Sequence, residues 1–147
     1  MVREAFEVSQ PNTIADTWPR LFTLRGQSGA IFALVFSPDD KWIVSGSLDG
    51  TIQYWDRSDG KLMATAMTGS AGRWLILTEA WFYAGSEGSD EAIGVVRGNT
   101  ALSAALVREH LFRPDLVEQL LKGDPDRRYR DAARKLDLPA VLKSGTP

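Results

Sequence analysis

The side chains that most often catalyse reactions or bind metals are scarce in this chain. Its 147 residues include no cysteine and one histidine, His110. The lack of cysteine excludes disulfides, thiolate metal sites and a cysteine nucleophile. A single histidine cannot supply a two-histidine metal site or a dyad with a second histidine. The sequence therefore predicts no metal and no other cofactor, and favours a surface or helix-end position for His110.

Ser86 is the one candidate nucleophile with a suggestive context. Residues 84–88 read Ala-Gly-Ser-Glu-Gly, which superficially resembles a nucleophile-elbow pattern. That motif needs a strand-to-helix turn, whereas a polar loop follows Ser86. The acidic pairs Asp39-Asp40 and Asp90-Glu91 fall in predicted turns, where carboxylates commonly accept hydrogen bonds from backbone amides. A hydrolase that uses Ser86 or a carboxylate pair stays an alternative, and a protein without enzymatic activity is favoured.

One basic run lies on a predicted helix near the C-terminus. Acidic residues interleave with it at spacings that allow pairing along the helix, so a solvated face is favoured over an RNA or anionic-lipid site. The chain has 17 Lys and Arg against 19 Asp and Glu, a net charge of -2, which gives no field to attract nucleic acid. We therefore expect no nucleic-acid partner. The basic residues are Arg127, Arg128, Arg130, Arg134 and Lys135, and the acidic ones are Asp126, Asp131 and Asp137.

Short strands separated by turns dominate the first half of the chain. Runs of β-favouring residues at 31–36, 42–47, 51–55 and 62–67 alternate with turn sequences such as Asp49-Gly50, where glycine tolerates positive φ. The first two runs are apolar at consecutive positions rather than at alternate ones. Both faces of the sheet that they form therefore need cover.

The second half changes from strand to helix. Runs at 73–78 and 80–84 predict a hairpin, and 92–96 predicts a further short strand. Beyond Gly98, start signals predict about three short helices, the last with an apolar stripe that needs a partner surface. The start signals are Asn99 or Thr100, Pro114 and Asp124-Pro125, and the stripe is Tyr129, Ala132, Ala133 and Leu136.

Residues 26–62 resemble one repeat of the WD-repeat β-propeller family, with Ser-Pro-Asp-Asp at 37–40, Ser-Gly-Ser-Leu-Asp-Gly at 45–50 and Trp-Asp at 55–56. Only one such repeat is present, whereas rings close with about four to eight blades. In that family a histidine before the first strand joins an Asp, a Ser or Thr and the Trp in a buried hydrogen-bond network. Gln27 stands in its place, and an amide can both donate and accept. The resemblance thus implies a structural network, without catalysis, of Gln27, Ser45 or Ser47, Asp49, and Trp55 of Trp55-Asp56.

Residues 73–143 resemble the tail that follows WD repeats in large bacterial proteins, many of which also carry a caspase-like protease domain. The matching motifs are Gly-Val-Val-Arg-Gly at 94–98, Phe-Arg-Pro-Asp-Leu-Val at 112–117 and Leu-Lys-Gly-Asp-Pro at 121–125. Where the tail pattern has Pro-Glu-Gly-Phe, this chain has Glu-Ala-Trp-Phe at 79–82. The glycine of the turn is lost, which predicts a distorted hairpin. The caspase-like catalytic region, with its His and Cys, has no counterpart in the chain.

The expected fold is mainly β with a C-terminal α-helical tail (α+β). It consists of one WD-repeat-like four-stranded blade, a β-hairpin and about three short helices. Four parts are expected along the chain. They are a flexible N-terminal arm at 1–20, the blade at 21–68, the hairpin segment at 69–98 and the helical tail at 99–147.

The expected function is that of a non-catalytic scaffold or protein–protein interaction module, a shortened WD-repeat protein that binds a protein partner or itself. Two alternatives stay open: a subunit that completes a propeller or serves a caspase-like protease in trans, and the hydrolase described above. Residues 1–20 lack the basic start and apolar run of a secretory signal. The apolar stretch 29–37 is roughly half as long as a membrane helix requires. We therefore expect a cytoplasmic protein with no membrane association.

Overall fold

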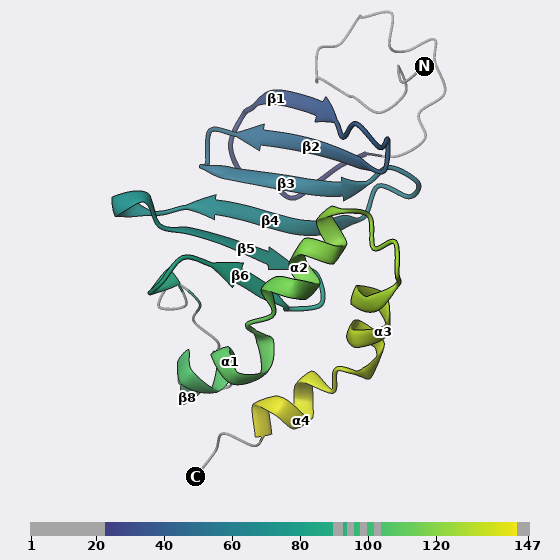
Figure 1. Cartoon of the computed structure of the whole chain (residues 1–147). Coiled ribbons are helices and arrows are strands. Elements are labelled where there is room, and N and C mark those ends of the chain that lie inside the picture. The colour runs from purple at the N-terminus through teal and green to yellow at the C-terminus, as the bar shows by residue number, and fades with distance from the viewer. Residues whose placement is uncertain (1–22, 90–92, 94–95, 98–99, 102–103, 144–147) are drawn as a thin grey trace, which may run out of the picture. The chain divides into compact units, whose positions relative to one another are not determined.

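The computed structural model describes residues 23–89, 93, 96–97, 100–101 and 104–143 (Figure 1). The chain divides into two compact units, Met1–Met63 and Ala64–Pro147. The described part is mainly β with a C-terminal helical part, as predicted. The predicted arm at 1–20 lies outside the described residues, and the four-part division of the chain stays a prediction.

Three antiparallel strands form the sheet of the first unit. They are β1 (Ile31–Phe36), β2 (Trp42–Ser47) and β3 (Thr51–Asp56), in that order. Their bounds agree with the predicted runs to within one residue. Gly50 adopts a φ of 85° in the turn between β2 and β3. This conformation suits glycine, and it allows the tight reversal that the Asp-Gly pair predicts.

β1 carries a β-bulge near its start. Ile31 pairs with Ser47 and Ala33 pairs with Gly46, so Phe32 is an extra residue in the ladder. A Cβ atom at Gly46 would lie 3.3 Å from Cζ of Phe32 and 3.7 Å from Cβ of Ala33. Both side chains therefore lie on the same face as Gly46. Strict alternation along the strand would have placed them on opposite faces.

The strand register gives this sheet two unlike faces. Face A is buried, with Ile43 at 0% and Trp55 at 3% exposure, and Leu24 and Leu62 pack against these two side chains. Face B is open over most of its length: Phe32 is 68%, Val35 57% and Ile52 43% exposed, whereas Trp42 at one end is 5% exposed. Face A consists of Ile31, Leu34, Phe36, Ile43, Ser45, Ser47, Gln53 and Trp55, and face B of Phe32, Ala33, Val35, Trp42, Val44, Gly46, Ile52, Tyr54 and Asp56.

The second unit contains its own antiparallel strands. β4 (Leu62–Thr68), β5 (Trp74–Thr78) and β6 (Tyr83–Gly85) are neighbours in that order, and the short 3-10 turn η2 (Ser70–Gly72) connects β4 to β5. β7 (Val96–Arg97) and β8 (Thr100–Ala101) pair separately. The predicted strand at 92–96 is therefore found only at its last position, and residues 92, 94 and 95 lie outside the described residues.

Four helices occur among the described residues, where about three were predicted: α1 (Ala104–Leu111), α2 (Pro114–Leu121), α3 (Arg128–Lys135) and α4 (Leu138–Lys143). The start of α1 was predicted too early, because Thr100 pairs in β8 instead of capping the helix. The missed helix is α4. Asp137 Oδ1 accepts a hydrogen bond from the backbone N–H of Ala140 (3.0 Å), and Pro139 fits the first turn of a helix.

The apolar stripe of α3 packs inside the second unit. The buried carboxylate of Asp124 accepts a hydrogen bond from the backbone N–H of Tyr129 (2.9 Å) and so holds the start of α3. The hydroxyl of Tyr129 accepts a hydrogen bond from the N–H of Ala80 (3.3 Å), and its ring meets that of Phe82 edge-on with centroids 6.0 Å apart. Leu136 packs against the buried cluster of this unit. The stripe thus covers the β5–β6 hairpin.

The turn between β5 and β6 forms without its glycine. Trp81 N–H donates to the carbonyl of Thr78 (3.0 Å), and Thr78 N–H donates to the carbonyl of Phe82 (2.9 Å). Trp81 has a φ of 71°, in the left-handed region that is sterically costly for a bulky residue. The missing glycine therefore strains the backbone of Trp81 and leaves the hydrogen bonds of the turn intact.

The strained backbone at Trp81 predicts that two variants of this residue reverse their usual order of stability. Trp81→Gly should be more stable to unfolding than Trp81→Ala by about 1 kcal/mol, because both lose the indole and only glycine adopts this φ without steric cost. Denaturant unfolding of both variants measures the difference. The same two substitutions at Trp74, inside β5 and similarly exposed at 45%, should give the usual order, with alanine the more stable. A more stable alanine at position 81 as well would contradict the strained turn.

Candidate functional site

A chain of hydrogen bonds joins face A to the segment that precedes β1. Trp55 Nε1 donates to Ser45 Oγ (2.9 Å), and Ser45 Oγ donates to Gln27 Oε1 (2.7 Å). Gln27 Nε2 lies within hydrogen-bond distance of the Ser45 carbonyl (3.3 Å), the Thr51 carbonyl (3.2 Å) and Thr51 Oγ1 (3.3 Å). Ser45 is 1% exposed. Gln27 therefore occupies the centre of the network, where its amide both accepts and donates.

Asp49 is the hydrogen-bond acceptor at the other end of this network. Its Oδ1 accepts hydrogen bonds from the backbone N–H (2.9 Å) and the hydroxyl (2.6 Å) of Thr51, and its Oδ2 accepts from the N–H (2.9 Å) and hydroxyl (3.2 Å) of Ser28. These bonds, those from Thr51 foremost, hold the pKa of the Asp49 carboxyl well below its ordinary value. The Thr51 hydroxyl connects the two halves, because it accepts from Gln27 and donates to Asp49.

The structure brings together most, but not all, of the residues that the sequence singled out. Ser47 lies at the margin, where its Oγ accepts a hydrogen bond from the N–H of Asp49 (3.2 Å). Asp56 lies in the following turn, where its Oδ1 accepts from the N–H (2.8 Å) and hydroxyl (2.6 Å) of Ser58. The residues joined directly in the network are Gln27, Ser45, Asp49 and Trp55, together with Ser28 and Thr51.

Sequence reasoning missed two members of this network. Thr51 could have been found, because a hydroxyl two residues after a turn Asp is a typical partner of that carboxylate. Ser28 carried no signal, since it meets Asp49 across 21 positions of sequence. Gly29 allows the backbone at Ser28 to approach Asp49 this closely. A Cβ atom there would lie 2.6 Å from the backbone nitrogen of Asp49, so a larger residue would push the segment away.

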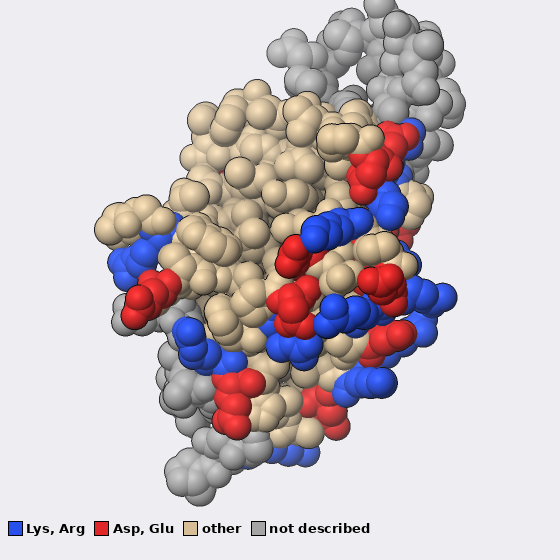
Figure 2. Space-filling model, in the orientation of Figure 1, with Lys and Arg blue, Asp and Glu red and all other residues tan. Residues whose placement is uncertain are grey.

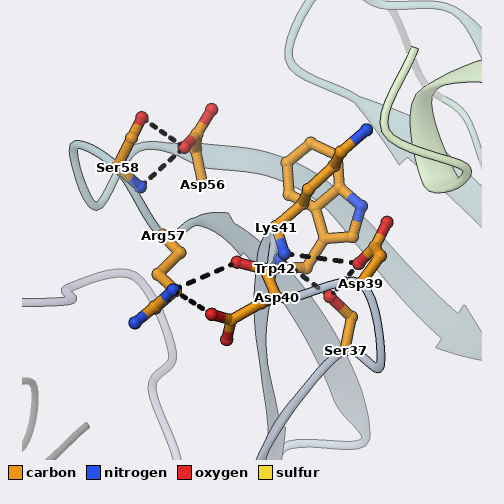
Figure 3. Close-up of polar contacts among 8 residues, drawn as sticks. All are labelled: Ser37, Asp39, Asp40, Lys41, Trp42, Asp56, Arg57 and Ser58. Carbon is orange, nitrogen blue, oxygen red and sulfur yellow. Dashed lines mark hydrogen bonds and ion pairs between the residues drawn. The ribbon is translucent and has the colours of Figure 1, made fainter. Parts of the chain in front are cut away.

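The side chains of Asp39 and Asp40 stabilise the turn between β1 and β2 (Figure 3). Ser37 Oγ donates to Asp39 Oδ1 (2.5 Å) and accepts from the N–H of Trp42 (2.9 Å). The bond from Ser37 lowers the pKa of the Asp39 carboxyl. Asp40 forms an ion pair with Arg57, which comes from the turn after β3. Both acids therefore have partners that stabilise turns.

Ser86 is held by the backbone of a neighbouring strand. Its Oγ accepts a hydrogen bond from the N–H of Trp74 (3.1 Å) and approaches the carbonyl of Trp74 at 3.5 Å. A turn follows it, in which the N–H of Ser89 donates to the Ser86 carbonyl (3.0 Å). In the described residues, a bend and a turn at 86–88 follow β6, whereas a nucleophile elbow passes directly from strand into helix.

The second unit also contains a pocket of about 440 Å³, lined in part by Met67, Ser70, Arg73 and Trp74. Arg73 Nη2 donates to Ser70 Oγ (3.2 Å), so its guanidinium is anchored in the wall. In the part of the chain that the structure describes, no group of three or more His, Asp or Glu is placed to hold a metal ion. Within the same residues, no helix has the length and apolar character to cross a membrane.

Charged side chains of both signs are intermixed over α2 and α3 (Figure 2). Several lie in ion pairs, and the Arg113 guanidinium lowers the pKa of the Asp115 carboxyl. A surface of alternating sign gives little attraction to a polyanion. The pairs are Arg113–Asp115 (2.8 Å), Lys122–Glu118 (2.5 Å), Arg128–Asp115 (3.4 Å) and Arg130–Asp124 (4.0 Å).

Face B is the most distinctive exposed surface of the first unit. Among the residues of β1, β2 and β3, the only charged one is Asp56, at the last position of β3. In the view of Figure 2, uncharged side chains cover most of these strands, and charged ones gather at one end. Exposed apolar side chains that lie together mark interaction sites, whereas scattered ones do not. Face B is therefore the candidate functional site.

Comparisons with known proteins agree with the expected WD-repeat-like blade. Residues 18–56 match the family model described as WD domain, G-beta repeat. The chain is similar to the protein HIRA of Zea mays (41% identical over 46 residues, 31% of this chain and 5% of that protein). It is also similar to the ribosome biogenesis protein BOP1 of Rattus norvegicus (31% over 103 residues, 70% and 12%). A third relative is the U3 small nucleolar RNA-associated protein 21 of Saccharomyces cerevisiae (54% over 37 residues, 25% and 4%).

Residues 18–56 are therefore similar to one WD repeat. The chain spans only 4% to 12% of the length of these three relatives. No solved structure matches the chain.

The low pKa of Asp49 predicts how the stability of the network depends on pH. A carboxyl with a depressed folded pKa stabilises the fold above its unfolded pKa of about 3.9, and this stabilisation is lost as the pH falls toward the folded value. The free energy of unfolding should therefore differ between the wild type and Asp49→Asn by a constant amount at pH 5 to 7, and this difference should shrink below about pH 4. Denaturant unfolding at several pH values measures it. A difference that is independent of pH down to pH 2 would contradict the role of the carboxylate.

Proposed function

We propose that the chain is a non-catalytic protein-interaction module, related to WD-repeat proteins, that presents face B to a protein partner. One observation carries this proposal. The network residues Gln27, Ser45 and Trp55 are bonded to one another, whereas the apolar residues Phe32, Val35 and Ile52 are exposed to solvent. The surface that the blade offers is therefore one for binding and not one for acid–base or nucleophilic chemistry.

The network residues are proposed to be structural. A buried indole N–H or hydroxyl without a partner costs about 1 to 3 kcal/mol, and Ser45 supplies the partner of Trp55. Gln27 and Asp49 bring the segment before β1 onto the strands through the bonds described above. We propose the same supporting role for Ser47 and Asp56, which order the two turns beside β3.

Burial of face B would stabilise a complex. Each large apolar side chain that moves fully from water into an interface contributes about 1.5 to 3 kcal/mol. Three such side chains stand more than two-fifths exposed on one face of a single sheet. A partner that covers them gains this free energy without having to match any charge on the face.

The candidate catalytic residues that the structure describes are held in bonds that stabilise the fold. Ser86 bonds to the backbone of Trp74, and the pair Asp39-Asp40 is bound within a turn. Asp90 and Glu91 lie outside the described residues. We accordingly propose no catalytic residue, no metal and no other cofactor.

We also propose a cytoplasmic protein whose partner is neither nucleic acid nor membrane. Two observations support the absence of a nucleic-acid partner: the net charge of -2 and the ion pairs of Arg128 and Arg130, two of the five residues of the basic run. The words ribosome biogenesis and small nucleolar RNA in the names of two relatives describe those much longer proteins. They match this chain through part of their length only.

A second candidate function is that the blade completes a propeller together with another chain. The open face B favours it, because the faces of a propeller blade lie against neighbouring blades. The resemblance of 73–143 to the tail of bacterial WD-repeat proteins extends this candidate to a partner that carries a caspase-like protease. The relatives named above come from a plant, a rat and a yeast and give that extension no support.

Photocrosslinking tests the proposed function. A photoreactive phenylalanine analogue replaces Val35 on face B, and in a matched variant it replaces Leu48, which is more exposed (74%) but lies in the turn between β2 and β3. Irradiation of native cells should give a discrete covalent adduct with a protein from position 35 and not from position 48. Adducts of equal yield from both positions, or none from position 35, would contradict the proposal.

A further inference from the structure

Face A is already covered by the chain itself. Leu24 packs against Ile43 and Trp55, and the amide of Gln27 bonds to Ser45. A Cβ atom at Gly26 would lie 3.4 Å from Cη2 of Trp55, which places the backbone of this segment directly over the indole. A second blade therefore has no access to face A at these positions, and the open face of the sheet is face B.

Symmetry then limits how copies of this chain can associate. Among contacts that stack one sheet on another, a head-to-tail contact would place face B of one copy on face A of the next, as between the blades of a propeller. The segment at 23–30 occupies that position on face A. A two-fold contact uses the same surface on both subunits and closes after two copies. Face B against face B is the arrangement that remains.

We propose that face B of one chain packs against face B of a second copy, forming a two-fold symmetric homodimer. The inference rests on the proposed function, because it identifies the protein partner as the chain itself. Phe32 is the central contact, since the bulge in β1 turns its side chain onto face B and it is 68% exposed there.

The charge of the surface supports a second copy as the occupant. A two-fold contact brings identical residues close to one another, so a charged residue near the axis would meet its own like charge. Phe32, Val35, Val44, Ile52 and Tyr54 carry no charge, and the one charged residue of these strands on face B, Asp56, is at the end of β3. The central part of the surface is therefore free of the repulsion that prevents most surfaces from pairing with themselves.

The size of the surface predicts a weak dimer. From the side-chain areas typical of aromatic and aliphatic residues, face B exposes roughly 500 Å² of apolar surface, or roughly 1,000 Å² for two copies. This value lies at the lower end for specific protein interfaces, where complexes are transient. We therefore expect a dissociation constant on the order of micromolar.

Sedimentation equilibrium of the purified full chain tests the dimer. Between roughly 1 and 100 μM, the mass should rise from 16.2 kDa toward twice that value. Phe32→Glu should raise the dissociation constant at least about tenfold, because it places two like charges in an apolar contact. Leu48→Glu, which adds the same charge to the turn, should leave it unchanged. A wild type that is monomeric at 100 μM, or equal weakening by both substitutions, would overturn the proposal.

Disulfide crosslinking gives a second test that does not depend on the fold tolerating a glutamate. The chain has no cysteine, so Val35→Cys or Ile52→Cys introduces a single thiol. Mild oxidation at 50 μM should link copies through position 35 or 52 several times faster than through Leu48→Cys. Equal rates at all three positions would overturn the dimer. A monomer in these two tests, combined with an adduct to a different protein at position 35 in cells, would reject the dimer and leave the proposed function standing.

Discussion

The hydrogen bond from Trp55 Nε1 to Ser45 Oγ is the interaction on which the first unit depends. An indole N–H buried without a partner would be costly, and the Ser45 hydroxyl supplies the partner while it donates its own proton to Gln27. Gln27 thereby ties the segment at 23–30 to the strands and places Leu24 against Ile43 and Trp55. This bond therefore couples the indole to the segment that covers face A.

Because the segment at 23–30 covers face A, the two faces of the sheet are unequal. Face A is closed by polar bonds and apolar packing, whereas Phe32, Val35 and Ile52 on face B are exposed. In the second unit, Tyr129 and Leu136 of the apolar stripe pack within the unit. In the first unit, three exposed large apolar side chains therefore share one face of the sheet, and a protein partner is the simplest way to cover them.

The sequence predicted the features that depend on neighbouring residues. Strand bounds followed from apolar runs and from turns such as Asp49-Gly50, and the resemblance to one WD repeat indicated Gln27, Ser45 and Trp55. It did not predict the bulge that turns Phe32 onto face B, because a ladder irregularity depends on pairing with β2. For the same reason, the residues that signal a helix start did not predict the β7–β8 pairing. The start of α1 was therefore predicted too early. The contact of Ser28 with Asp49 also depends on the fold and not on local sequence.

A double-mutant cycle between Trp55→Phe and Gln27→Met tests the central claim most directly. Hydrogen exchange of the β2 and β3 amides gives the free energy of unfolding for the wild type, both single variants and the double variant. Because Ser45 bonds to both side chains, the cycle should show a coupling energy of about 0.5 to 3 kcal/mol. The matched cycle of Trp55→Phe with Leu48→Ala, an exposed residue of the turn at the other end of the β2–β3 hairpin, should be additive. Additivity within about 0.3 kcal/mol between positions 55 and 27 would contradict the account.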